Sequence, residues 1–134
     1  MKLYYDAENA ILGRVGSTVC KELLKGHEAV IINADKCIIS GDRLKIIADL
    51  HWWKDLGGIG LKGPRVSRNP DLLMKRMIRG MLPWNITKGR EAYARLRCYV
   101  GNGPLKAEEL KNVKKLATVK PIKYVVLKDA AKEI

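Results

Sequence analysis

The sequence predicts an α/β protein with a parallel β-sheet. A short apolar segment at 3–5 precedes an amphipathic helix at 12–25, and a continuous apolar run at 29–33 follows it. A strand, a helix and a strand joined by short connections are typical of a right-handed βαβ unit, whose two strands are parallel. The chain has 134 residues, 47% hydrophobic and 30% charged, which is typical of a folded protein with its own core. We expect one domain over residues 1–134.

The helix and the second strand of this βαβ unit each have a distinct sequence pattern. The apolar side chains of the first helix fall on one stripe: Leu12, Val15, Val19, Cys20 and Leu23. Gly26 follows as the expected C-terminal stop. The run from Ala29 to Asn33 has no polar alternation, which is typical of a strand that is buried on both faces.

The remaining elements are shorter. We expect a strand at 37–40 that ends at Gly41-Asp42, a helix at 43–54, a strand at 98–100 and a break at 101–104. A helix at 107–117 and a last strand at 123–127 follow, with Asp129 as the cap of a final helical turn.

Positive charge is concentrated in one segment. Residues 61–97 contain ten Lys/Arg and only two acids, Asp71 and Glu91, so this quarter of the chain carries +8 of the total +12. Residues 1–60 are neutral, with eight basic and eight acidic side chains. A patch of this kind predicts a polyanionic partner.

The basic segment contains a helix with two different faces. Asn69 is the expected N-cap and Pro70 the first helical residue. At about 100° per residue, Leu73, Met74, Met77, Ile78 and Met81 lie on one side, opposite Lys75, Arg76 and Arg79, and only Leu72 breaks the division. Gly80 and Pro83 end this helix. One face is therefore expected to pack on the core while the other presents cations.

A second short helix at 89–96 completes the predicted nucleic-acid interface. The candidate RNA-binding residues are Lys62, Arg65, Arg68, Lys75, Arg76, Arg79, Trp84, Lys88, Arg90, Arg95 and Arg97. Cations spread over a loop and two helices suit contacts with phosphates, and no helix-turn-helix spacing is present, so folded RNA is favoured over a DNA operator. Two alternatives stay open: a merely solvated helix face, and a Trp84 that seals the core instead of stacking on a base.

Other classes of site have little support. Cys20, Cys37 and Cys98 are far apart and lack a CxxC pair, which favours small buried side chains in a reducing cytoplasm over a disulfide or zinc site. No apolar run approaches a membrane span, and no nucleophile motif or cofactor site is evident. Asp6 and Asp35 follow predicted strands, where capping is the expected role.

One glycine-rich motif supports a second hypothesis. Residues 58–63 match GxGxxG, the dinucleotide fingerprint, so a nucleotide-dependent enzyme on the same α/β layers is an alternative. That motif needs a strand before it and a helix after it, whereas here a predicted helix end precedes it and Pro64-Arg65 follows. A loop that lies along a phosphate backbone explains the motif better.

Several separate motifs also resemble one family. The segments ILGR at 11–14, INADK at 32–36, ISGD at 39–42, RGMLP at 79–83, KGREA at 88–92 and LRCYVG at 96–101 are similar to ribosomal protein thirteen of the large subunit, in its archaeal and eukaryotic form. The likeness covers about residues 3–101 in order. Two parts differ from the family pattern: Trp84-Asn85-Ile86-Thr87 replaces a basic continuation, and residues 102–120 follow no familiar pattern.

The resemblance implies a three-layer α/β/α fold with a mainly parallel four-stranded sheet. It also implies a non-catalytic, cytoplasmic constituent of the large ribosomal subunit without cofactors or small-molecule substrates. Its partners would be large-subunit ribosomal RNA and neighbouring ribosomal proteins, such as the third of that subunit. An RNA-binding regulator that acts off the ribosome would use the same surface and remains the third hypothesis.

Overall fold

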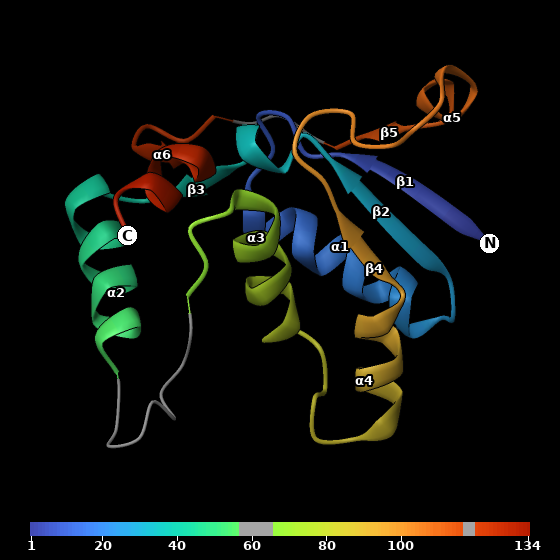
Figure 1. The fold of residues 1–134 in the computed structure, drawn as a ribbon, viewed down its shortest axis with the longest axis horizontal. Helices are drawn as coiled ribbons and strands as arrows, with labels where there is room; N and C mark the ends of the chain where they lie inside the picture. Colours follow the sequence, from blue (N-terminus) through green and yellow to red (C-terminus); the bar gives the residue numbers. More distant parts are fainter. Residues whose placement is uncertain (57–65, 117–119) are drawn as a thin grey trace.

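The main sheet has four parallel strands. The computed structural model describes residues 1–56, 66–116 and 120–134. The strands of this sheet lie in the order β4-β2-β1-β5, with β1 at Lys2–Asp6, β2 at Glu28–Ile32, β4 at Leu96–Cys98 and β5 at Lys114–Lys115. Figure 1 shows β1, β2 and β4 side by side, with β5 at the edge of the sheet.

The predicted βαβ unit is present. Helix α1 (Leu12–Leu24) joins β1 to β2, and these strands pair in parallel from Lys2 opposite Glu28 to Asp6 opposite Ile32. Gly26, just after the helix, has a φ of +99°, a backbone conformation that residues with a Cβ rarely adopt. The stripe predicted for α1 is the face that the protein buries.

The two faces of the sheet are covered by different helices. Leu3, Tyr5, Ala29, Ile31 and Leu96 point to one face and belong to the core that includes residues of α1 and of α3 (Pro70–Arg79). On the other face, α5 (Ala107–Lys111) approaches β1, where the Tyr4 hydroxyl donates a 2.9 Å hydrogen bond to Glu109. The three-layer α/β/α fold with a parallel four-stranded sheet is therefore confirmed.

Two predicted strands lie outside this sheet. β3 (Ile38–Ser40) and β6 (Tyr124–Val126) form a separate antiparallel pair. Helix α2 (Arg43–Asp55) and helix α6 (Leu127–Lys132) lie beside this pair, next to the C-terminus in Figure 1. The short 3-10 turn at Ala34–Lys36 connects β2 to β3.

Four predicted boundaries were wrong. The helix expected at 89–96 is α4, Thr87–Ala94, because Leu96 must enter β4 opposite Ala29, and the strand expected at 98–100 is correspondingly earlier. The helix expected at 107–117 ends at Lys111, and residues 114–115 instead pair with β1. Asp129 does not cap α6, which begins two residues earlier, where the Leu127 N–H donates to Cys37 O at 2.8 Å.

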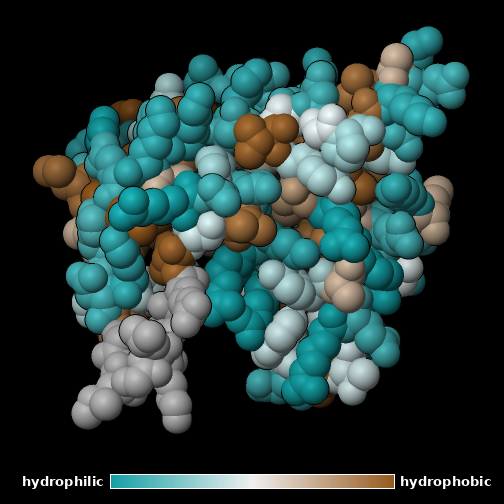
Figure 2. All heavy atoms as spheres, in the orientation of Figure 1, coloured by the Kyte–Doolittle hydropathy of each residue, from teal (hydrophilic) through white to brown (hydrophobic). Residues whose placement is uncertain are grey.

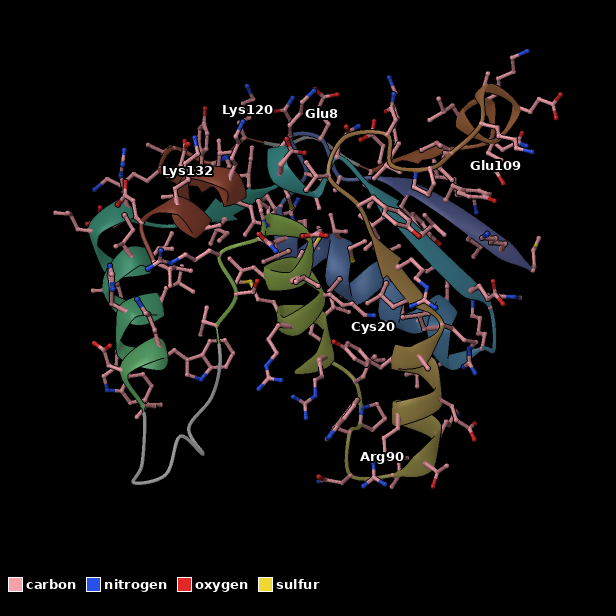
Figure 3. The ribbon with its side chains drawn as sticks, in the orientation of Figure 1. Glu8, Cys20, Arg90, Glu109, Lys120 and Lys132 are labelled. Atoms are coloured by element: carbon pink, nitrogen blue, oxygen red, sulfur yellow. The ribbon has the colours of Figure 1, made fainter. Side chains whose placement is uncertain are left out.

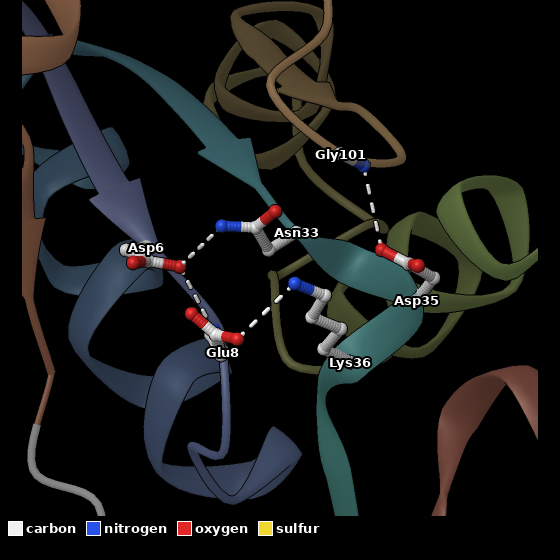
Figure 4. Close-up of polar contacts among 6 residues, drawn as sticks. All are labelled: Asp6, Glu8, Asn33, Asp35, Lys36 and Gly101. Atoms are coloured by element: carbon white, nitrogen blue, oxygen red, sulfur yellow. Dashed lines mark hydrogen bonds and ion pairs between the residues drawn. The ribbon is translucent and has the colours of Figure 1, made fainter.

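The carboxyl ends of β1 and β2 are joined by polar side chains. Asp6 accepts hydrogen bonds from the Glu8 backbone at 3.0 Å and from Asn33 Nδ2 at 2.9 Å. Asp35 accepts from the Gly101 backbone at 3.3 Å, as Figure 4 shows. Both aspartates therefore act as loop-capping groups, as the sequence predicted.

The three cysteines are free and buried. Burial raises the pKa of the Cys37 and Cys98 thiols to about 12, which keeps both side chains neutral near pH 7. They pack as small apolar residues, in line with the prediction. Within the described ranges, no helix combines the length and the apolar character that crossing a membrane would need.

Candidate nucleic-acid interface

Helix α3 has the two predicted faces. Leu73, Met74 and Ile78 are fully buried, and the thiol of Cys20 on α1 contacts Ile78 O at 4.0 Å. Lys75, Arg76 and Arg79 on the opposite side are only partly buried. The helix starts at Pro70 after Asn69, as predicted, although the Asn69 side chain makes no capping bond.

The turn after α3 is tightly packed. α3 ends at Arg79 with Gly80 as its C-cap, and Leu82 is buried while Pro83 remains exposed. Gly89 on α4 lies so close to Pro83 that a Cβ at this position would be 2.5 Å from the Pro83 carbonyl carbon. α4 therefore packs directly against the backbone of the turn at Pro83.

Trp84 sits at the centre of a set of cationic and aromatic side chains. The Arg79 guanidinium lies 4.0 Å from the centroid of the Trp84 ring, and Tyr93 meets Trp84 edge to face at 5.3 Å and 88°. Lys75 Nζ lies 4.8 Å from the Tyr93 ring, and Arg90 Nε donates to Trp84 O at 3.0 Å. These contacts hold three cations of α3 and α4 in place without neutralising them.

The cations of this region lack acidic partners. In the part of the chain that the structure describes, the ion pairs are Lys25–Glu22, His27–Glu22, Lys36–Glu8 and Arg43–Glu133, all outside residues 66–97. Arg68, Lys88 and Arg90 are exposed. Figure 3 shows Arg90 at the end of the molecule that α4 forms. We call the group Lys75, Arg76, Arg79, Trp84, Lys88 and Arg90 the α3–α4 surface.

A groove borders the α3–α4 surface. It has a volume of about 360 Å³ and is lined by Trp53, Arg76, Arg79, Gly80, Leu82, Pro83, Trp84 and Asn85. Figure 2 shows mostly hydrophilic side chains over α3 and α4. Sequence reasoning did not assign Trp53 or Asn85 to the site. Only the tertiary approach of α2 brings Trp53 there, although the spacing of Ile46, Leu50 and Trp53 places it on the inner side of its helix.

Two of the predicted RNA-binding residues lie elsewhere. Arg97 alternates with the core residues Leu96 and Cys98 along β4 and thus points to the opposite face of the sheet. Arg95 Nη2 donates to Leu23 O at the end of α1 at 2.8 Å, and its Nε is buried without a hydrogen-bond partner. Both side chains line a separate hollow of about 410 Å³. Its lining also includes Lys2, Lys106, Glu28 and Glu109.

Two further predicted residues, Lys62 and Arg65, lie outside the described residues, as does the glycine-rich motif at 58–63. The structure therefore brings together six of the eleven candidates on the α3–α4 surface, with Arg68 at the approach to α3. Trp84 is partly buried: its ring lies against the Arg79 guanidinium and packs edge to face on Tyr93.

The structure is an α/β scaffold on which two helices present cations without an ion-pair partner among the described residues, an arrangement typical of surfaces that bind polyanions. Comparison with known proteins is more specific. A family model described as ribosomal protein L13 matches residues 1–104, and the chain belongs to this family. Membership in a family of ribosomal proteins confirms the expectation of a non-enzymatic protein.

The chain is similar to several archaeal proteins, each named large ribosomal subunit protein uL13. The relative from Methanocaldococcus jannaschii is 39% identical over 132 residues, which cover 96% of this chain and 94% of the relative. The one from Thermoplasma volcanium is 37% identical over 131 residues, 96% of this chain and 95% of the relative. The one from Methanopyrus kandleri is 47% identical over 97 residues, 72% of this chain, but the match spans only 60% of that relative's length. The resemblance noted in the sequence, including its archaeal type, is confirmed.

Proposed function

We propose that this protein is a structural constituent of the large ribosomal subunit in the cytoplasm, and that the α3–α4 surface binds ribosomal RNA. The relatives at 37–39% identity that match along almost their whole length support the first part, because each is named for that subunit. The neighbouring ribosomal proteins of that subunit are the further expected partners. In this role the protein stabilises folded RNA during subunit assembly and translation.

One observation carries the RNA-binding part of the proposal. The described residues 66–97 contain eight cations and two acids, and none of these cations is in an ion pair with a described residue. Surface cations of an ordinary soluble protein are interspersed with acids, because mixed charge avoids a large field of one sign. The positive field of these cations is not compensated by described acidic residues, which favours a partner that carries negative charge.

The geometry suits phosphates more than base edges. Arginines present a planar fork of donors that matches phosphate oxygens, and those of α3 and α4 are spread over two helices and a turn. Contacts of this kind fix the position of an RNA without reading its sequence. Six such contacts would make affinity fall by about 10³ between 50 and 200 mM salt.

A charge reversal tests the assignment. Arg76→Glu with Arg79→Glu is compared with Lys21→Glu plus Lys45→Glu, which changes the net charge equally at exposed positions on α1 and α2. Binding to protein-free large-subunit RNA is measured over a range of salt. We expect the α3 variant to lose most of its affinity and about two units of the log–log salt slope, while the control retains both. Equal losses in the two variants would show that only net charge matters and would contradict the assignment.

A further inference from the structure

The groove beside the α3–α4 surface is lined by both aromatic and cationic side chains. α2 contributes Trp53, while α3 and the following turn contribute two arginines and Trp84. None of the described residues that line it is an Asp or a Glu. Its volume of about 360 Å³ falls within the range of pockets that hold small planar groups. The groove therefore offers flat apolar surface and positive charge together.

The Arg79 guanidinium has one face covered by Trp84 and its other face uncovered by an aromatic ring. A guanidinium is planar, and one of its faces rests on the Trp84 ring at 4.0 Å from the centroid. Arg79 also lines the groove, and its guanidinium makes no hydrogen bond or ion pair with another described residue. Its second face and its N–H donors are thus available to a ligand in the groove.

Trp84 acts as the support of this arginine. Its ring is in contact with Arg79 and with the Tyr93 ring, and its backbone is held at both ends: Trp84 N–H donates to Leu82 O at 2.8 Å, and Trp84 O accepts from Arg90. A platform that is fixed before binding loses little conformational entropy when a ligand stacks on it.

We propose that this groove holds one unpaired base of the bound RNA, stacked on the Arg79 guanidinium and bounded on the other side by Trp53. The proposal rests on the proposed function and adds a specific site to it. Unpaired bases expose the flat faces that paired bases bury, and proteins receive them on aromatic rings and arginine planes. Arg76 lies in the same lining to meet the adjoining phosphate, and Asn85 provides an amide for the edge of the base.

The test compares neighbouring tryptophans. Trp53 lines the groove, whereas Trp52 is 65% exposed and does not. The probe is a short single-stranded RNA with a central 2-aminopurine, whose emission falls on stacking, and a matched strand with an abasic site there. Wild type, Trp53→Ala, Trp53→Leu, Arg79→Lys and the control Trp52→Ala are titrated with both strands. Circular dichroism verifies folding, and the leucine variant keeps apolar volume in case alanine unfolds α2.

We expect wild type and Trp52→Ala to quench the probe and to bind the abasic strand about 5- to 150-fold more weakly. The Trp53 variants and Arg79→Lys should lose the quenching and the preference for the intact strand, and Arg79→Lys should retain the salt slope because its charge is unchanged. Normal RNA binding with equal affinity for the two strands would overturn the base site alone. If wild type bound no RNA at low salt, the proposed function and this inference would fail together.

Discussion

Gly89 offers the sharpest test of how the α3–α4 surface is built. A Cβ at this position would collide with the Pro83 carbonyl oxygen and lie 2.5 Å from its carbonyl carbon. The obstacle is backbone, which cannot rotate away as a side chain does. Overpacking of this kind costs about 1–3 kcal/mol, and we take the upper end because the turn itself must move. Since alanine in place of glycine returns about 1 kcal/mol of helix propensity, Gly89→Ala should lose about 2 kcal/mol net.

Two other helical glycines provide the comparison. At Gly13 on α1 a Cβ would meet nothing within 4 Å, so Gly13→Ala should stabilise the protein by about 0.4–1 kcal/mol. At Gly16 the Cβ would meet the Met81 sulfur at 2.5 Å, and this exposed, flexible side chain can move aside. We therefore expect a loss at Gly16 that is smaller than the loss at Gly89.

Urea and thermal unfolding followed by circular dichroism measure these differences. At about 4 °C per kcal/mol for a chain of this size, Gly89→Ala should lower the melting temperature by roughly 8 °C, and Gly13→Ala should raise it slightly. If Gly89→Ala proved as stable as Gly13→Ala, the close approach of α4 to the turn would be wrong, and so would the idea that this approach positions Trp84.

Three further predictions concern other parts of the molecule. The Lys106 backbone N–H and the Tyr4 hydroxyl lower the pKa of Glu109, so its contribution is present above the unfolded value of 4.5 and lost as pH falls through the lower folded value; the protection of the α5 amides, measured as hydrogen exchange relative to the intrinsic rate at each pH, should therefore fall at acid pH in wild type and stay constant in Glu109→Gln. Arg95→Ala, which removes the charged hydrogen bond to the end of α1, should destabilise the fold by about 1.5–3 kcal/mol, whereas Arg97→Ala on the exposed side of β4 should stay within about 0.5 kcal/mol in the same urea assay. Asn33 has a φ of +54°, so Asn33→Ala should cost about 1–2 kcal/mol more than Asn33→Gly, which tolerates that conformation; equal losses would show that the backbone strain is unimportant.

Long amphipathic elements were predictable from the sequence, because their signal repeats over several turns. The stripe of α1 and the two faces of α3 each rest on five or more side chains with helical spacing. α1 buries all of its predicted residues, whereas α3 buries Leu73, Met74 and Ile78; Met77 is only partly buried, and Met81 lies beyond the end of the helix and is exposed. The candidate cations of α3 followed directly from that division. Gly26 and Pro70 marked helix ends for local steric reasons that the rest of the fold does not change.

Short elements and contacts between distant residues were not predictable in this way. β5 consists of Lys114 and Lys115, whose sequence has no strand pattern and which form a strand only through pairing with β1. The pairing of β3 with β6 joins residues about 86 positions apart, from Ser40 opposite Tyr124 to Ile38 opposite Val126, and a three-residue strand does not show its partner. Arg95 had the same charge signal as its neighbours, and only the packing of β4 against α1 shows its bond to Leu23.

The central claim is that this protein is a constituent of the large ribosomal subunit that many cations hold to RNA. Sedimentation of the tagged protein from a cell lysate through sucrose gradients at moderate and at high salt tests it most directly. We expect the wild type to migrate with the large subunit at both salt concentrations, and the variant Arg76→Glu plus Arg79→Glu to be released at a lower salt concentration than the wild type. Wild-type protein near the top of both gradients would contradict the claim, and release of the wild type at high salt alone would favour an RNA-binding protein that acts off the ribosome.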